Sequence, residues 1–160
     1  MMAVPPHQSG SALFGNPVFL SAVCSLLLAQ FVKALVNLLR LPKHSLSEAL
    51  LTFAWKTGGM PSSHSALAVS ISTSIAFKNG LNSEIFVLSA FFALVVIRDA
   101  LGVRHSSGIQ ARALNALGKK YSVRSGETWV PIKEVMGHTP SQVFVGSLLG
   151  FFIALAFSTL

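Results

Sequence analysis

At residues 58–65 the sequence reads Gly-Gly-Met-Pro-Ser-Ser-His-Ser, directly before an apolar run over residues 66–77 that predicts a helix. Glycines permit backbone conformations that other residues avoid, and Pro61 fits the first turn of a helix, where its missing N–H is not needed. The N–H groups of residues 62–65 would then be unpaired donors at a helix start, a place suited to an anion such as phosphate. His64 adds a group that exchanges a proton near neutral pH. A helix cap beside a chance histidine is the simpler interpretation.

The composition indicates a membrane protein. The chain has 160 residues, which suits one domain, with 52% hydrophobic and only 11% charged residues. Charged residues make up about a quarter of an ordinary soluble domain. The formal net charge of +7 points to an anionic partner, and with so much apolar sequence we expect membrane lipids. Nucleic acid is not expected as a partner, because the basic segment lacks interleaved aromatic residues.

Apolar runs of span length predict an all-α, polytopic membrane helical bundle with about four spanning helices. The runs cover residues 17–39, 66–78, 84–101 and 141–160. The second run is rich in Ser and Thr, which favours packing among other helices over contact with lipid. Residues 17–160 are therefore predicted to form a single membrane-embedded domain behind a flexible N-terminus, residues 1–16.

Shorter segments are predicted to lie between or beside the spans. Residues 45–55 begin with a capping pattern and are too short to span, so we expect an interfacial or re-entrant helix. Residues 109–117 predict a short amphipathic helix that Gly118 ends. Gly146 and Gly150 are spaced as in a close helix–helix contact, either within the chain or in a homo-oligomer. Trp55 and Trp129 suggest membrane-interface anchors, and a headgroup-facing patch is expected at Lys119, Lys120 and Arg124.

Basic residues gather on one predicted face of the membrane. The segments 40–64 and 102–140 fall on this face and contain most of the cations, whereas the opposite face has only Lys78. The positive-inside rule therefore places the basic face in the cytoplasm. A phosphate site would raise the same count wherever it faced.

Most candidates for chemistry lie on the basic face. Gln30, Lys33 and Asn37 share one helix face, so Lys33 either snorkels to the interface or enters a polar pocket. Arg98 and Asp99 end a span and suit an interfacial ion pair, although Asp99 beside a basic site also suits a functional role. His138, like His64, adjoins a proline-opened helix start.

Two histidines among fixed cations suit phosphoryl transfer without a metal or other cofactor. One imidazole could attack phosphorus, the other could protonate the leaving oxygen, and the cations could hold the remaining oxygens. A metal site would need more ligands than this face offers, since Asp99 and Glu134 are its main acids and Cys24 lies within a span.

These motifs resemble the type-2 phosphatidic acid phosphatase and vanadium haloperoxidase superfamily. Lys33, six residues, Arg40 and then Leu-Pro is similar to the first signature, with one residue inserted before the proline. Pro-Ser-Ser-His at 61–64 resembles Pro-Ser-Gly-His, and His138 falls where the third signature has its nucleophile. The ordered set over residues 17–155 is closest to the divergent branch of small membrane proteins.

The resemblance implies a role for each matched position. It implies that Lys33, Arg40, Arg104 and the backbone of Ser62 and Ser63 hold phosphate, with Gly58, Gly59 and Pro61 shaping that backbone. It also implies His64 as general acid and His138 as nucleophile. Two positions depart from the superfamily: Ile132 replaces an arginine, and Gln142 replaces the aspartate that supports the nucleophile. Gln142 can orient an imidazole but cannot offset its charge, so Asp99 is the substitute candidate.

We therefore expect an integral membrane lipid phosphatase that acts through a phosphohistidine. With a cytoplasmic site, phosphatidic acid or phosphatidylglycerol phosphate is favoured over an outward-facing polyprenyl phosphate or diphosphate. Ile132 and Gln142 keep open an alternative, a non-catalytic protein that binds or transports a phosphate or lipid-phosphate anion in the same pocket. Vanadate-dependent halide oxidation is a third, less favoured activity.

Overall fold

The structure, a computed structural model, describes residues 13–40, 59–134 and 137–159. Within these ranges every regular element is helical. The helices are α2 (Pro17–Arg40), α4 (Ser63–Asn79), α5 (Glu84–Arg98), the π-helical turn η1 (Asp99–Val103), α6 (Arg104–Ser125) and α7 (Pro140–Thr159). The prediction of an all-α helical fold is confirmed.

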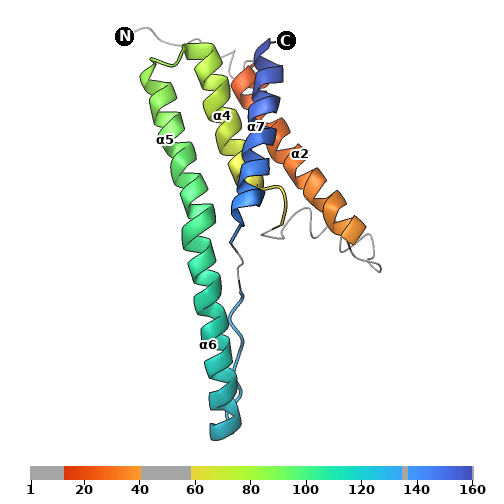
Figure 1. Cartoon of the computed structure of the whole chain (residues 1–160), viewed down its shortest axis with the longest axis vertical. Helices are drawn as coiled ribbons and strands as arrows, with labels where there is room; N and C mark the ends of the chain where they lie inside the picture. Colours follow the sequence, from red (N-terminus) through yellow and green to blue (C-terminus); the bar gives the residue numbers. More distant parts are fainter. Residues whose placement is uncertain (1–12, 41–58, 135–136, 160) are drawn as a thin grey trace.

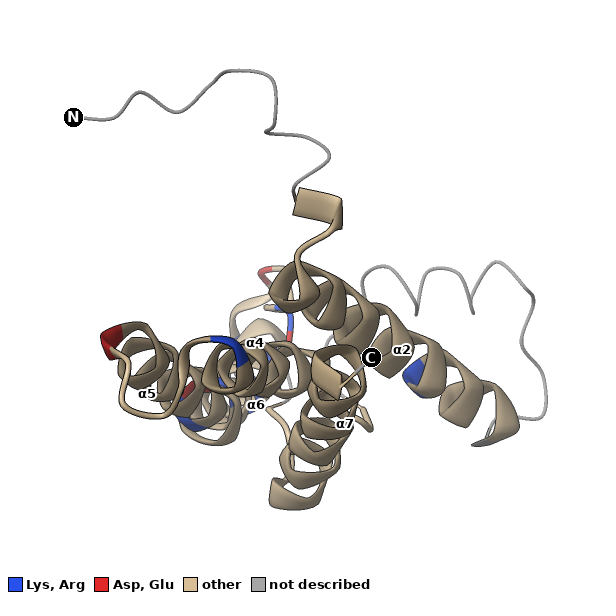
Figure 2. Ribbon diagram, turned by 90° about the horizontal axis from the view of Figure 1, so that it is seen from above, with Lys and Arg blue, Asp and Glu red and all other residues tan. Residues whose placement is uncertain are grey.

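Helices α2, α4, α5 and α7 form the bundle, and α6 extends beyond it (Figure 1). Viewed along the bundle, α4 lies between α5 on one side and α2 and α7 on the other (Figure 2), and it contacts all three. The chain runs up α4, down α5 and up α7. The start of α4, the turn η1 and the start of α7 therefore meet at one end of the bundle, which we call the site end.

Small side chains allow three helices to approach α4. Seven of its residues are buried, and all are serine or alanine. Hydroxyl pairs join the helices, because Ser21 of α2 and Ser74 share a hydrogen bond of 2.7 Å and Ser89 of α5 donates to Ser72 at 3.4 Å. Small and hydroxylated residues are typical of close helix contacts in membranes. The prediction that this helix packs among others is confirmed.

Two glycines of α7 set its contact with α4. A Cβ added to Gly146 would collide with the carbonyl oxygen of Ser62, and one added to Gly150 would collide with that of Ala66. Glycine is therefore required at both positions for the backbones to lie this close. The sequence left open whether these glycines face the same chain or a second copy, and the structure assigns the contact to the chain itself.

Three helices are long and apolar enough to cross a membrane, not about four as predicted. They are α2 over Pro17–Leu39, the continuous helix Glu84–Ser125, and α7. Helix α4 has 17 residues, about 25 Å at 1.5 Å per residue, which is shorter than a hydrocarbon core of about 30 Å. The serines that let it pack centrally also lower its hydropathy.

The helix that begins at Glu84 continues much farther than predicted. It runs without a break through η1 and α6 to Ser125, and Gly126, with φ +76°, forms its left-handed C-cap. Gly118, predicted to end a helix over residues 109–117, lies inside α6 instead. Its missing side chain leaves room for the indole of Trp129, which a Cβ would overlap.

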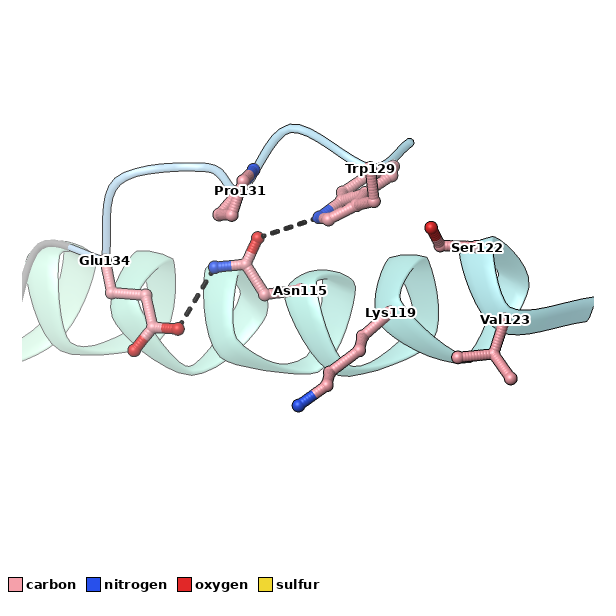
Figure 3. A pocket seen from close by; sticks show the side chains of 7 residues that line it. All are labelled: Asn115, Lys119, Ser122, Val123, Trp129, Pro131 and Glu134. Atoms are coloured by element: carbon pink, nitrogen blue, oxygen red, sulfur yellow. Dashed lines mark hydrogen bonds between the residues drawn. The ribbon is translucent and has the colours of Figure 1, made fainter. Parts of the chain in front are cut away.

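The segment that follows α6 returns along it toward the bundle (Figure 1). The Asn115 amide donates to the Ile132 carbonyl at 2.9 Å and to Glu134 at 3.0 Å, and its oxygen accepts from the N–H of Ile132 at 2.8 Å. The indole of Trp129 also donates to this oxygen, at 3.4 Å (Figure 3). Trp129, suggested by the sequence as an interface anchor, therefore packs on α6, at one side of a pocket of about 350 Å³.

Some predictions fall outside the described residues. These are the flexible N-terminus over residues 1–12, the short helix over residues 45–55 with Trp55, Gly58, and the side chain of Arg40.

Candidate active site

Four parts of the chain supply the candidate site at the site end of the bundle (Figure 1). They are the last turns of α2, the segment from Gly59 into the start of α4, the turn η1 with the first residue of α6, and the segment 137–139 before α7. These parts are far apart in sequence, and the antiparallel bundle brings them to one end.

The segment from Gly59 to Ser62 is shaped by its glycine and its cap. Gly59 has φ +92°, a left-handed conformation that favours glycine. A Cβ at this position would lie 3.3 Å from Cε of Lys33, so the glycine also gives the lysine room. Pro61 is fully buried, and the Ser62 hydroxyl caps α4 by accepting from the N–H of Ser65 at 3.4 Å.

Two of the four N–H donors predicted at the start of α4 already have partners. The Ser62 N–H donates to the Gln142 carbonyl at 3.0 Å, and the Ser65 N–H donates to the Ser62 hydroxyl. Within the described residues, the N–H groups of Ser63 and His64 make no hydrogen bond. They lie in the first turn of α4, where the helix carries a partial positive charge. The anion-binding capacity of this turn therefore rests on these two donors.

Lys33 lies inside the bundle and does not snorkel to its edge. Its side chain is only 3% exposed and runs against Gly59. The same helix face carries Gln30, whose side-chain oxygen is buried without a hydrogen-bond partner in the described part of the chain. Of the two interpretations offered by the sequence, the structure supports a polar pocket.

His138 is held by its backbone and left open at its ring. Its N–H donates to the Ala100 carbonyl in η1 at 3.1 Å, and the residue is 6% exposed. Neither ring nitrogen has a hydrogen-bond partner among the described residues. Buried polar groups nearly always have a partner, so an unpaired buried imidazole suggests a place that a ligand fills.

Arg104 is paired with Asp99 across the π-helical turn. Its Nε donates to Oδ2 of Asp99 at 2.7 Å, and both side chains are about one-third exposed, at 33% and 38%. The sequence suggested an ion pair of Asp99 with its neighbour Arg98. The structure instead gives Asp99 to Arg104, which leaves the exposed Arg98 outside this pair.

The positive groups of the site act together on His138. Burial lowers the pKa of His138 from 6.5 to about 4, and the charges of Lys33, Arg104 and His64 lower it further in the same direction. Because these effects act over short distances, Lys33, Arg104 and both histidines belong to one electrostatic environment. His138 is therefore neutral at pH 7, as a nitrogen nucleophile must be.

Gln142 caps α7. Its side-chain oxygen accepts from the N–H of Thr139 at 3.1 Å, and its own N–H donates to the Thr139 hydroxyl at 3.4 Å. These reciprocal bonds form a capping box. The sequence analysis gave Gln142 the task of orienting an imidazole, but its oxygen is engaged in the cap. The pattern Thr-x-x-Gln over residues 139–142 was the overlooked signal.

The structure thus gathers most of the residues that the sequence singled out. It brings Lys33, Ser62, Ser63, His64, Arg104 and His138 to the site end, with Asp99 held on Arg104 and Gln142 on Thr139. Arg40 ends α2, but its side chain is outside the described part, as is Gly58. The Ala100 carbonyl, which holds the backbone of His138, had no signal in the sequence.

Comparisons with known proteins are consistent with this arrangement. Residues 14–153 match a family described as the divergent PAP2 family. The uncharacterized membrane protein YuiD of Bacillus subtilis (strain 168) is 34% identical over 154 residues, covering 89% of this chain and 94% of that protein. No solved structure matches the chain. With its three apolar helices, the chain is an integral membrane protein.

Proposed function

We propose that this chain, which belongs to the divergent PAP2 family, is a membrane phosphatase that removes the phosphate group from a lipid phosphate. The observation that carries the proposal is the imidazole of His138. It is buried, has no hydrogen-bond partner among the described residues, and lies in the field of Lys33 and Arg104. A phosphate group would supply both the missing partner and the missing negative charge.

In the proposed first step, a ring nitrogen of neutral His138 attacks phosphorus. A bond forms between nitrogen and phosphorus while the bond from phosphorus to the lipid oxygen breaks. Protonated His64 gives its proton to the departing oxygen, so the lipid leaves as an alcohol. Lys33, Arg104 and the N–H groups of Ser63 and His64 hold the other phosphate oxygens. These groups supply the positive charge that the transition state needs, so the steps as proposed use no metal.

In the proposed second step, water attacks the phosphohistidine. Neutral His64 takes a proton from this water, the bond from nitrogen to phosphorus breaks, and orthophosphate leaves. His138 returns to its neutral form and His64 to its protonated form. The exposed position of His64 suits this role, because it can meet both the leaving oxygen and water.

A lipid substrate is favoured by the position of the site. It lies where membrane-spanning helices end, near the depth at which lipid headgroups meet water. If the site end faces the cytoplasm, phosphatidic acid or phosphatidylglycerol phosphate fits better than an outward-facing polyprenyl phosphate or diphosphate.

A second candidate function is anion binding or transport without turnover. One observation favours it: no carboxylate among the described residues bonds to the ring of His138. Asp99 is paired with Arg104, and Gln142 is engaged in its cap. A nucleophilic imidazole that gains charge without a carboxylate partner would react more slowly.

Phosphate release from a panel of lipid phosphates tests the proposal. The full chain, purified in detergent, is given phosphatidic acid, phosphatidylglycerol phosphate, and polyprenyl phosphate and diphosphate. We expect His138→Ala to abolish release and His64→Ala to slow it about 10²–10⁴-fold. The matched control is His105→Ala, which alters an exposed histidine on α6 and should leave the rate unchanged.

Acid-quenched reactions with radiolabelled substrate decide between the two functions. A phosphorylated histidine that is absent in His138→Ala supports the enzyme. Tight phosphate binding without turnover or a trapped intermediate supports the binder. Full phosphate release by His138→Ala would contradict the proposed mechanism.

A further inference from the structure

The turn η1 allows an ion pair that an α-helix would not. Asp99 and Arg104 are five residues apart, and at 100° per residue an α-helix would place them about 140° apart around its axis. In the wider π turn, bonds run from residue i to i+5, and the Arg104 N–H accordingly donates to the Asp99 carbonyl. The two side chains then lie on one side, with 2.7 Å between Nε and Oδ2.

The same turn holds the segment that carries His138. The His138 N–H donates to the Ala100 carbonyl at 3.1 Å. One residue earlier, Gly137 packs on the backbone of His105, where there is no space for a Cβ. A single π turn therefore sets both the guanidinium of Arg104 and the backbone of His138.

The ion pair leaves the useful part of Arg104 available. Asp99 engages Nε, and the two terminal nitrogens keep their four N–H bonds, arranged in a plane suited to two phosphate oxygens. Because both side chains are about one-third exposed, such a pair contributes little to folding stability. Its larger effect is to restrict a long, flexible side chain before the anion arrives.

We propose that Asp99 is a positioning residue that acts through Arg104, not through either histidine, to orient the guanidinium toward the bound phosphate. This inference rests on the proposed function for the identity of the anion. Restricting one such side chain beforehand is worth roughly a two- to tenfold gain in affinity. Asp99 is thus assigned to the binding of phosphate and not to proton transfer.

A double-mutant cycle on the full chain in detergent tests the inference. Asp99→Asn, Arg104→Ala and the double variant are compared with the unmodified protein, with inorganic phosphate as the probe of binding. We expect Asp99→Asn to weaken phosphate binding roughly two- to tenfold and to have no further effect once Arg104 is alanine. On a lipid phosphate substrate it should raise KM more than it lowers kcat.

Glu134→Gln is the matched control, because it removes the other Arg–carboxylate pair of the described helix, Arg112–Glu134 at 3.5 Å. It should leave phosphate binding unchanged. A loss from Asp99→Asn that persists in the Arg104→Ala background, or a fall in kcat alone, would overturn the inference. If the unmodified protein binds phosphate but hydrolyses no lipid phosphate, the proposed function fails while the binding cycle still decides the role of Asp99.

Discussion

At the scale of single residues, the state of His138 follows from its surroundings. An imidazole that is buried, unpaired and surrounded by cations loses much of its affinity for a proton. This is unfavourable for a structural histidine, which would gain by pairing with a carboxylate. It suits a nucleophile, which needs its nitrogen lone pair at the working pH.

The pKa of His138 predicts a stability that falls in mild acid. Burial and nearby cations lower this pKa to about 4, whereas the unfolded chain takes up the proton near 6.5. The contribution of His138 to stability is complete above pH 6.5 and is lost as the pH falls from 6.5 toward 4, by up to about 3 kcal/mol. Thermal unfolding in detergent across this window should therefore shift less with pH in His138→Gln than in the unmodified protein. Equal slopes in the two proteins would contradict the shift, and His105→Gln serves as the control.

The chemistry of single residues was partly predictable from the sequence. Lys33, His64, Arg104 and His138 could be selected because charged or titratable groups at the ends of apolar helices have few other uses. Gln142 was misassigned because a local capping box competes for its side chain. The pair of Asp99 with Arg104 was not predictable, since its spacing fits only a π turn.

At the scale of elements, the contact between α4 and α7 sets the distance between the two histidines. Each helix begins in the site, and Gly150 of α7 lies against Ala66 of α4 well away from it. Predicting this contact from the spacing of Gly146 and Gly150 succeeded because only small residues allow such an approach. The end of α6 was predicted wrongly, because the space that Trp129 takes over Gly118 is a tertiary requirement.

Gly150→Ala should weaken both stability and activity without touching the site. The added methyl cannot fit against the Ala66 carbonyl, so the helices must separate, at a cost of about 1–3 kcal/mol. A displacement of about 1 Å between His64 and His138 could lower the rate about 10²-fold. Thermal unfolding and phosphate release measure the two effects. Ala156→Val adds volume at an exposed position of the same helix and should change neither. An unchanged rate in Gly150→Ala would show that this contact does not position the histidines.

At the scale of the whole molecule, the cations beyond the site indicate the orientation in the membrane. A phosphate site would attract basic residues wherever it faced, so Lys33 and Arg104 carry no topological information. Other cations lie along α6 and its return segment, starting two turns past Arg104: Arg112, Lys119, Lys120, Arg124 and Lys133. Near the opposite end of the bundle the described helices carry only Lys78. The asymmetry therefore persists without the site residues, and the positive-inside rule predicts a cytoplasmic site end.

Cysteine labelling in intact bacterial cells tests this orientation. Cys24 is the sole cysteine, so Cys24→Ala provides a background for Ser125→Cys at the end of α6 and Asn82→Cys in the turn between α4 and α5, both exposed positions. An impermeant maleimide should label position 82 in intact cells and position 125 only after the membrane is opened. The reverse pattern would place the site outside. It would then favour an outward-facing polyprenyl phosphate or diphosphate as substrate, because a glycerolipid phosphate made in the cytoplasmic leaflet could not reach His138.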